Sequence, residues 1–357
     1  SYFQQSQTTH VYAGPGIDKM VVSNNLASGG LQIRNDAPGK VSGSNLYPVT
    51  LKLEKAPFDP SHPENTGTVL SITNAAGDGT LKGQIEWVSP GMYQEALKPI
   101  RFDNLKKGET RSVAIPYLSA DSLKFRVALD NGERYETSVK LSQSFASRSE
   151  TADHTPTIEV SGPEHYYSVG GSWGGADDLG LTSKVTWDEA HLYVNVDVKD
   201  NVHSQTFTGG DIWQGDSLQV GIDLAKEDGA ASRQVNELGF ALNKDGSVQK
   251  WRWRAPDGVT PGPLESVQAV ITRDEMAKVT HYELTLPFQA LHGAGYDFHV
   301  DKPIGLALLV NENDGDGRSG FMEFNGGIGT SKDAGLFGNL YLLQDDYVKL
   351  LEKSAQA

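Results

Sequence analysis

Residues 185–199 read Val-Thr-Trp-Asp-Glu-Ala-His-Leu-Tyr-Val-Asn-Val-Asp-Val-Lys, and from Leu192 onward apolar and polar side chains alternate strictly. Leu192, Val194, Val196 and Val198 fall on one face of an extended chain, because successive side chains of a strand point to opposite faces. A strand with one apolar and one polar face is typical of an antiparallel sheet that covers a core on one side. The segment therefore predicts half-buried antiparallel sheet rather than a parallel α/β core.

The same period of two recurs on both sides of this segment, at residues 51–54, 84–87, 123–129, 135–141, 218–222 and 306–310. Asp130-Asn131-Gly132 separates two of these runs and favours the positive φ angles of a tight hairpin turn. The 39 glycines and 16 prolines fit many short strands joined by turns. We expect an all-β chain made of antiparallel β-sandwiches.

The length of 357 residues is comfortable for two such domains. A polar stretch with few strand-forming residues at 147–157 predicts a linker between a first domain at 1–146 and a second at 158–344. In the last residues, 345–357, Tyr347, Leu350 and Leu351 recur at helical spacing, which predicts a short C-terminal helical tail.

The charge of the chain is unevenly distributed. Residues 1–150 hold 16 basic and 15 acidic side chains, whereas residues 151–357 hold 15 and 31 and so carry a net charge of −16. A domain this acidic repels phosphate backbones, which argues against nucleic acid as a partner, and it favours neutral over anionic polysaccharides. Solubility alone is the other interpretation of the acidity.

Several classes of site are excluded by composition. The chain has no cysteine, so it has no disulfide, thiolate nucleophile or cysteine zinc site. No apolar run approaches the roughly 20 residues of a membrane helix, so we expect no membrane span. Residues 1–10 lack the basic-then-apolar order of a signal peptide, which indicates a mature or excised segment.

Four segments of the second half resemble, in this order, the family 9 carbohydrate-binding modules and their wider DOMON-like superfamily. They are a Trp-Asp-x-x-x-Leu-Tyr-Val strand at 187–194, a Trp-x-x-Asp-Ser strand ending in Ile-Asp at 213–223, a strand with Glu before Pro-Phe at 282–288, and a closing Phe-Gly at 337–338. The resemblance implies a two-sheet sandwich that often binds structural calcium and recognises neutral glycans. Upstream, residues 104–109 and 113–116 resemble the Ig-like modules that accompany polysaccharide-active enzymes, a likeness of fold only.

The resemblance also suggests which residues contact a sugar. Trp213 matches the tryptophan that stacks on a sugar ring in the family, and an indole offers broad apolar area to the C–H face of a pyranose. Hydrogen-bonding candidates around it are Gln219, Asn311, Arg318, His203 and Gln205. Trp251 and Trp253 share one strand face and form either a second stacking platform or part of the core. Trp187, within a motif that the whole superfamily carries, is expected in the core.

One position departs from the family pattern. The better-known sugar-binding members have a second tryptophan just before the closing Phe-Gly, so that two indoles hold the sugar between them. Ser331 stands at that position here. A lower affinity, a different ligand or a substitute aromatic residue are the possible consequences.

The segment Asn311-Glu-Asn-Asp-Gly-Asp-Gly-Arg318 is the best candidate for a structural calcium site. Calcium takes six to eight oxygen ligands, and Asn313, Asp314 and Asp316 supply such oxygens in a glycine-rich loop. Asp200 and Asp223 are alternative ligands at positions matching the family. An ordinary acidic hairpin turn is the other interpretation.

We therefore expect a non-catalytic carbohydrate-binding protein, a targeting module of a secreted polysaccharide-degrading enzyme whose catalytic domain lies in a longer precursor. Its place would be outside the cell or at the cell surface. A shallow site predicts affinities between micromolar and millimolar, about −4 to −8 kcal/mol. Three alternatives stay open: a β-sandwich polysaccharide-active enzyme, a haem-binding electron-transfer module, and a structural or adhesion scaffold.

Overall fold

The computed structural model describes residues 48–55, 68–75, 79–89, 98–115, 118–226, 230–293, 295–344 and Lys349, together with short backbone strands before residue 44. Those early strands are β1 (Tyr2–Phe3), β2 (Val11–Ala13), β3 (Lys19–Val22), β4 (Leu26–Ala27), β5 (Ile33–Asn35) and β6 (Lys40–Gly43). The chain divides into two compact units, residues 1–56, 67–115 and 122–141 in the first and residues 57–66, 116–121 and 142–357 in the second. The helix expected at 345–357 lies outside the described residues except for Lys349, which is helical.

The first unit contains antiparallel strands, as the alternating segments predict. β7 (Val49–Lys55), β8 (Thr68–Asn74) and β11 (Thr110–Ile115) form one sheet, and β9 (Thr80–Ser89) pairs with β10 (Ile100–Lys106) and β12 (Ala120–Leu129). Leu70, Ile85, Phe125 and Val127 are fully buried between these strands. The hairpin predicted at Asp130-Asn131-Gly132 is present, since the Gly132 N–H donates to the Leu129 carbonyl before β13 (Arg134–Arg148). The Ig-like assignment of this unit stays a prediction.

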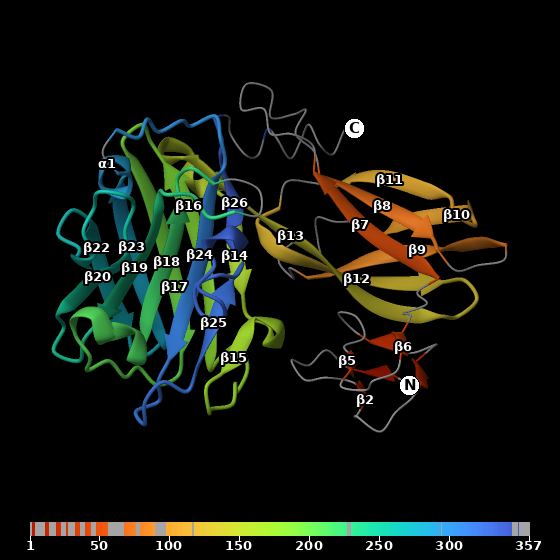
Figure 1. Cartoon of the computed structure of the whole chain (residues 1–357), viewed down its shortest axis with the longest axis horizontal. Helices are drawn as coiled ribbons and strands as arrows, with labels where there is room; N and C mark the ends of the chain where they lie inside the picture. The colour runs from red at the N-terminus through yellow and green to blue at the C-terminus, as the bar shows by residue number, and fades with distance from the viewer. Residues whose placement is uncertain are drawn as a thin grey trace. The chain divides into compact units, whose positions relative to one another are not determined.

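The second unit consists of two sheets of mainly antiparallel strands. The first sheet has the order β14 (Thr157–Val160), β16 (Leu179–Trp187), β17 (His191–Asp200), β23 (Val279–Pro287) and β22 (Gln268–Asp274). The second sheet has the order β15 (Tyr166–Ser168), β25 (Gly320–Phe324), β24 (Ile304–Glu312), β18 (Ser217–Asp223), β19 (Val235–Leu242), β20 (Val248–Arg254) and β21 (Gly262–Pro263). β26 (Gly338–Leu342) pairs with the start of β24. The parallel pairs are those of the end of β13 with β16 and β26. In Figure 1 the long strands of both sheets run lengthwise through this unit, with β16 and β17 in the first sheet and β18, β24 and β25 in the second.

The core of the second unit is built from the inward side chains of both sheets. Leu192, Val194, Val196 and Val198 of β17 belong to one buried cluster with Leu218 and Val220 of β18, and with further side chains of β19, β24 and β25. Their polar neighbours Asn195 and Asp197 are exposed. The alternation read from the sequence is thereby confirmed, and so is the all-β class.

The second sheet differs from the first in that its outer face is also covered. β18, β24 and β25 are buried along their whole length. Ile328, Ala334 and Phe337, from the segment between β25 and β26, pack on Ala307 and Leu309 of that outer face. This segment contains η6 (Ala334–Leu336). The segment between β25 and β26 therefore forms a wall above the outer face of the second sheet.

The stretch predicted as a linker, 147–157, contains ordered structure in the second unit. Gln143–Ala146 of β13 pair with β26 of the second sheet, and Ser147 and Arg148 pair with β16 of the first sheet. The 3-10 helix η3 (Ser149–His154) and the start of β14 complete it. Two more short 3-10 helices, η4 (Pro163–His165) and η5 (Gly209–Gln214), and one helical turn α1 (Phe288–Leu291) lie in loops. Among the described residues no helix has the length and apolar character needed to cross a membrane.

Candidate functional site

A cavity of about 350 Å³ lies over the outer face of the second sheet. Its floor comes from β18, β19 and β20, and its walls come from η5, from Arg318 and from the segment between β25 and β26. The lining residues are Trp213, Gln219, Glu237, Trp253, Arg254, Arg318, Ile328, Gly329 and Lys332. Four of the eight predicted sugar-contact residues are therefore together in one pocket: Trp213, Gln219, Trp253 and Arg318.

Trp213 stands at the rim because the helix that carries it is anchored on either side of it. Its neighbour Ile212 is fully buried, and the side-chain amide of Gln205 donates to the carbonyls of Ile212 (2.9 Å) and Asp216 (3.0 Å). The indole of Trp213 itself is 39% exposed. An exposed indole on a loop fixed from below is a surface against which a flat apolar ligand face can pack.

Trp251 and Trp253 of β20 support this loop from the other side. At Gly209, which starts η5 with a φ of +59°, and at Gly210, the nearest side chain to an added Cβ would be Trp251. The Trp253 indole N–H donates to the Gly210 carbonyl (2.8 Å), and its ring continues into the pocket lining. Trp253 is thus part of the site and Trp251 part of its support, and both lie outside the main core cluster.

Gly239 leaves the space in which the Trp253 ring lies. A Cβ added at Gly239 would overlap the far edge of that ring, and would also come within 3.1 Å of Ile212 Cδ1. Replacing Gly239 by alanine is expected to displace the pocket wall, destabilise the unit by about 1–3 kcal/mol and weaken ligand binding. Thermal unfolding and ligand titration measure both effects. Gly326→Ala is the control, because an added Cβ there has its nearest contact at 3.6 Å. An unchanged affinity in Gly239→Ala would show that the Trp253 wall is not used.

Two polar side chains of the pocket each have a buried atom without its usual hydrogen-bond partner. Gln219 is 4% exposed, and its Oε1 has no hydrogen-bond partner among the described residues. The same holds for Nε of Arg318, whose guanidinium lies 5.4 Å from the Trp213 ring centre and 4.5 Å from that of Phe321. Burial lowers the pKa of Arg318, although the charge of Glu323 opposes this. Buried polar atoms without partners are rare in folded proteins, so they mark a place where a ligand completes the hydrogen bonding.

The pocket also contains residues that the sequence did not single out. Glu237 of β19 is buried and forms an ion pair with Lys332 from the covering segment. The alternation of Glu237 and Gly239 with the core residues Leu238 and Phe240 was a usable signal for the face on which Glu237 lies. Lys332 and Gly329 carry no such signal, because they reach the pocket only through the fold of an irregular segment.

The other predicted contact residues lie outside the pocket lining. Gln205 is occupied by the hydrogen bonds that hold η5. The Asn311 amide donates to Ser217 Oγ (3.0 Å) and is fully buried in β24. His203 faces Asp200 and Asp216, and its Nε2 is 2.9 Å from the Leu242 carbonyl.

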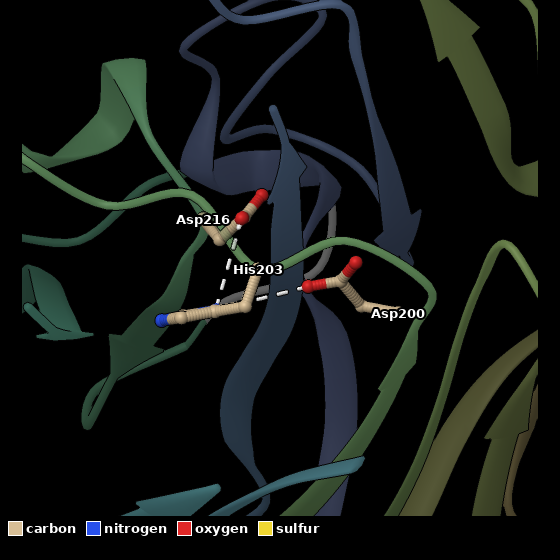
Figure 2. Close-up of side chains that lie close together, drawn as sticks. All are labelled: Asp200, His203 and Asp216. Carbon is tan, nitrogen blue, oxygen red and sulfur yellow. Dashed lines mark ion pairs between the residues drawn. The ribbon is translucent and has the colours of Figure 1, made fainter. Parts of the chain in front are cut away.

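Figure 2 shows the carboxylates of Asp200 and Asp216 both directed at the His203 ring, each 3.7 Å from Nδ1. Burial raises the pKa of Asp216 well above its usual value, and the charge of Asp200 adds to this. Cations already accompany these acids, since Arg273 lies 3.7 Å from Asp200. Asp216 further accepts the backbone N–H groups of Ser204 and Asn313. This cluster is largely satisfied within the protein.

A second acidic cluster consists of Asp178, Glu312 and Asp314, with one oxygen of each within 4.8 Å of the others. Neither Glu312 oxygen has a hydrogen-bond partner among the described residues, and Glu312 is almost completely buried. Burial, together with the charges of Asp200, Asp314 and Asp178, raises the pKa of Glu312 to about 9. Within the described part of the chain no basic side chain forms an ion pair with the three acids. Calcium prefers oxygen ligands alone, so this donor set fits calcium better than the first cluster does.

Of the predicted metal ligands, only Asp314 belongs to this cluster. The side-chain oxygen of Asn313 accepts the N–H groups of Gly315 (2.8 Å) and Gly317 (3.2 Å), which closes the loop, and Asp316 is exposed. Asp200 belongs to the histidine cluster, and the Asp223 carboxylate accepts from Ala225 and Ser232. The sequence did not identify Asp178, because it lies more than 130 residues away from Glu312 along the chain. Glu312 lies inside the candidate segment 311–318 but was not among the ligands predicted there.

The comparison with family models matches one region of the chain. A family model described as carbohydrate family 9 binding domain-like matches residues 151–345, more than half of the chain. No curated protein matches the chain significantly.

Solved structures similar to this chain share little sequence with it. A family 9 carbohydrate-binding module from Caldicellulosiruptor kristjanssonii in complex with cellotriose is 13% identical, with a TM-score of 0.42, and covers 57% of this chain and 94% of its own. The same organism's module in complex with glucose is 14% identical, with a TM-score of 0.42 and coverages of 57% and 97%. A putative carbohydrate-binding protein from Bacteroides uniformis is 10% identical, with a TM-score of 0.37 and coverages of 57% and 98%.

Proposed function

Because the chain belongs to the carbohydrate family 9 binding domain-like family, we propose that its second unit binds a sugar ring of a glycan in the pocket beside Trp213. The observation that carries this proposal is the pairing of an exposed indole with a buried acceptor that lacks a partner. Trp213 offers apolar area for the C–H face of a pyranose, and Gln219 Oε1 accepts a hydrogen bond from a ring hydroxyl. Trp253 supplies a second aromatic wall of the pocket. It would take the part of the family's second tryptophan, whose sequence position is held by Ser331 in this chain.

The pocket favours binding over hydrolysis. Glycoside hydrolysis ordinarily uses two carboxyl groups on either side of the scissile bond. Among the described residues that line this pocket, Glu237 is the only acid, and Lys332 already pairs with it. A site with stacking area, donors and acceptors but one paired carboxylate is suited to equilibrium recognition.

A glycan array probed with the full chain tests the proposal. Retention of a defined set of glycans, and its loss on competition with the same free oligosaccharides, is the expected result. If the array retains no glycan while the protein is folded by circular dichroism, the binding function is wrong and a scaffold role explains the chain better. We further propose that the unit targets a secreted polysaccharide-degrading enzyme to its substrate; the N-terminal unit would then act as a spacer.

Calcium is proposed to stabilise the loop that leads into the pocket. Asp178, Glu312 and Asp314 would hold the ion, and its positive charge would offset an acidic cluster in which burial, together with the charges of Asp200, Asp314 and Asp178, raises the pKa of Glu312. Arg318, a pocket residue, follows Asp314 by four positions in the same loop. The ion would therefore fix a segment that carries a ligand contact.

Removing calcium with EDTA is expected to lower the melting temperature by roughly 5–10 °C relative to protein with free calcium at about 100 times the dissociation constant. This corresponds to ~2.7 kcal/mol of binding free energy linked to folding. In Glu312→Gln the calcium effect should disappear. The EDTA-treated variant should be more stable than EDTA-treated wild type, because Glu312, with its pKa raised to about 9, must take up a proton on folding at neutral pH and glutamine need not. Asp316→Asn removes an exposed charge from the same loop and should keep the full calcium effect. Equal melting temperatures with and without EDTA in wild type would rule out the ion.

A further inference from the structure

The charge of the pocket is opposite to that of the half of the chain that contains it. Residues 151–357 carry a net charge of −16. The pocket lining has three cationic side chains, Arg254, Arg318 and Lys332, against the single carboxylate of Glu237. Lys332 pairs with Glu237, so two arginines face the cavity without an ion-pair partner among the described residues. At physiological ionic strength the Debye length is about 8 Å, so a bound ligand senses this local charge more than the distant acids.

Arg318 is placed as a half-buried cation that forms no ion pair among the described residues, and the charge of Glu323 acts on it only from beyond ion-pair distance. Its guanidinium lies against the Trp213 and Phe321 rings, and Nε is buried without a hydrogen-bond partner within the described ranges. A buried charge is costly unless it is paired and hydrogen-bonded. Contact with two rings restricts the movement of the guanidinium, whose planar fork of donors suits an anion with two oxygens in a plane.

We propose that the sugar bound in this pocket carries a carboxylate, that is, a uronic acid residue whose acid group pairs with Arg318 and Arg254. This inference rests on the proposed glycan binding and specifies the ligand class of the same site. A uronic acid supplies what the pocket lacks: a C–H face for Trp213, a hydroxyl donor for Gln219 Oε1, and an anion for the two arginines. A neutral hexose supplies the first two and leaves both cations unpaired.

The test compares sugars that differ only in this charge. Methyl glycosides of glucuronic acid and galacturonic acid, and their uncharged methyl esters, are titrated against the full chain by calorimetry at about 0.15 M salt. Both epimers are used, and sulfated galactose is included as a second kind of anion. At least one acid should bind about 10-fold or more tightly than its ester, as expected for a charge-assisted hydrogen-bonded pair.

Variants assign the preference to the pocket. Arg318→Gln should bring the acid-to-ester ratio close to one. If this variant unfolds, Arg254→Gln carries the same test, since Arg254 is half-buried at the pocket edge. Arg233→Gln is the matched control: it removes the same charge from a side chain that is 86% exposed and outside the lining, and it should keep the preference.

The outcomes separate this inference from the proposed function. If acid and ester bind equally and Trp213→Ala abolishes both, the pocket binds glycans but the carboxylate assignment is wrong. Tighter binding of the sulfated sugar than of either uronate also overturns the carboxylate, and a preference that survives both Arg318→Gln and Arg254→Gln overturns the role of the arginines. Absence of binding by every sugar here and on the array overturns the glycan-binding proposal itself.

Discussion

Trp213→Ala is expected to weaken glycan binding by about 30-fold or more, which corresponds to ~2 kcal/mol, while the unit remains folded. The indole contributes apolar contact area at the pocket rim and also covers one side of the Arg318 guanidinium. Loss of the indole both removes the stacking surface and exposes the Arg318 guanidinium to water. Since Trp213 is 39% exposed at the pocket rim and lies outside the core clusters, its truncation leaves an opening that water can fill rather than a closed cavity.

The measurement is a calorimetric titration with the tightest glycan found on the array, accompanied by thermal unfolding of the same sample. Val270→Ala is the control, because Val270 is 57% exposed on the first sheet and does not line the pocket. It should bind like wild type. Should Trp213→Ala also bind like wild type, the site beside Trp213 is not the glycan site.

Trp187→Ala is expected to have the opposite profile, with a loss of about 3–5 kcal/mol in the free energy of unfolding. Trp187 at the end of β16 is 1% exposed, its indole N–H donates to the Leu343 carbonyl (3.0 Å), and the Arg148 guanidinium lies 4.2 Å above its ring. Truncation leaves a large cavity between the turn from β16 to β17 and the end of β26. It also leaves the buried Leu343 carbonyl without its donor.

Urea unfolding followed by circular dichroism gives this free energy. Trp187→Phe keeps most of the volume and should cost clearly less than the alanine variant, whereas Trp213→Ala should stay within about 1 kcal/mol of wild type. If Trp187→Ala is as stable as wild type, the ring does not hold the two sheets together and the core assignment is wrong.

These two tryptophans show how far the sequence reaches. Both occur in motifs of the family pattern: Trp187 directly precedes Asp188, and Trp213 precedes Asp216 by three positions. That pattern predicts Trp187 in the core and Trp213 accessible to a ligand. The structure agrees with both placements, because burial in a sandwich follows directly from the alternation along each strand.

The pocket could be predicted only in part. Gln219 was assigned to the polar face of its strand by alternation, and that face is the pocket floor. Glu237 was within reach of the same reasoning. The predicted contacts His203, Gln205 and Asn311 were near Trp213 in the sequence or family pattern, yet their side chains hydrogen-bond to other residues of the protein and do not line the pocket. Sequence proximity to a loop does not tell which of its side chains build the loop and which face outward.

The alternation of side chains, the turn residues and the family motifs by themselves determined the all-β class, the strands of the main core and the half of the chain that carries the site. Tertiary structure alone decided the electrostatics. Summed charge predicts an acidic surface, but the covering segment between β25 and β26 brings Lys332 to Glu237 and leaves Arg254 and Arg318 to face the cavity. The tertiary structure likewise brings Asp178 together with Glu312 and Asp314. Charges act over a few ångströms of space, and only the fold determines which charges lie within that distance.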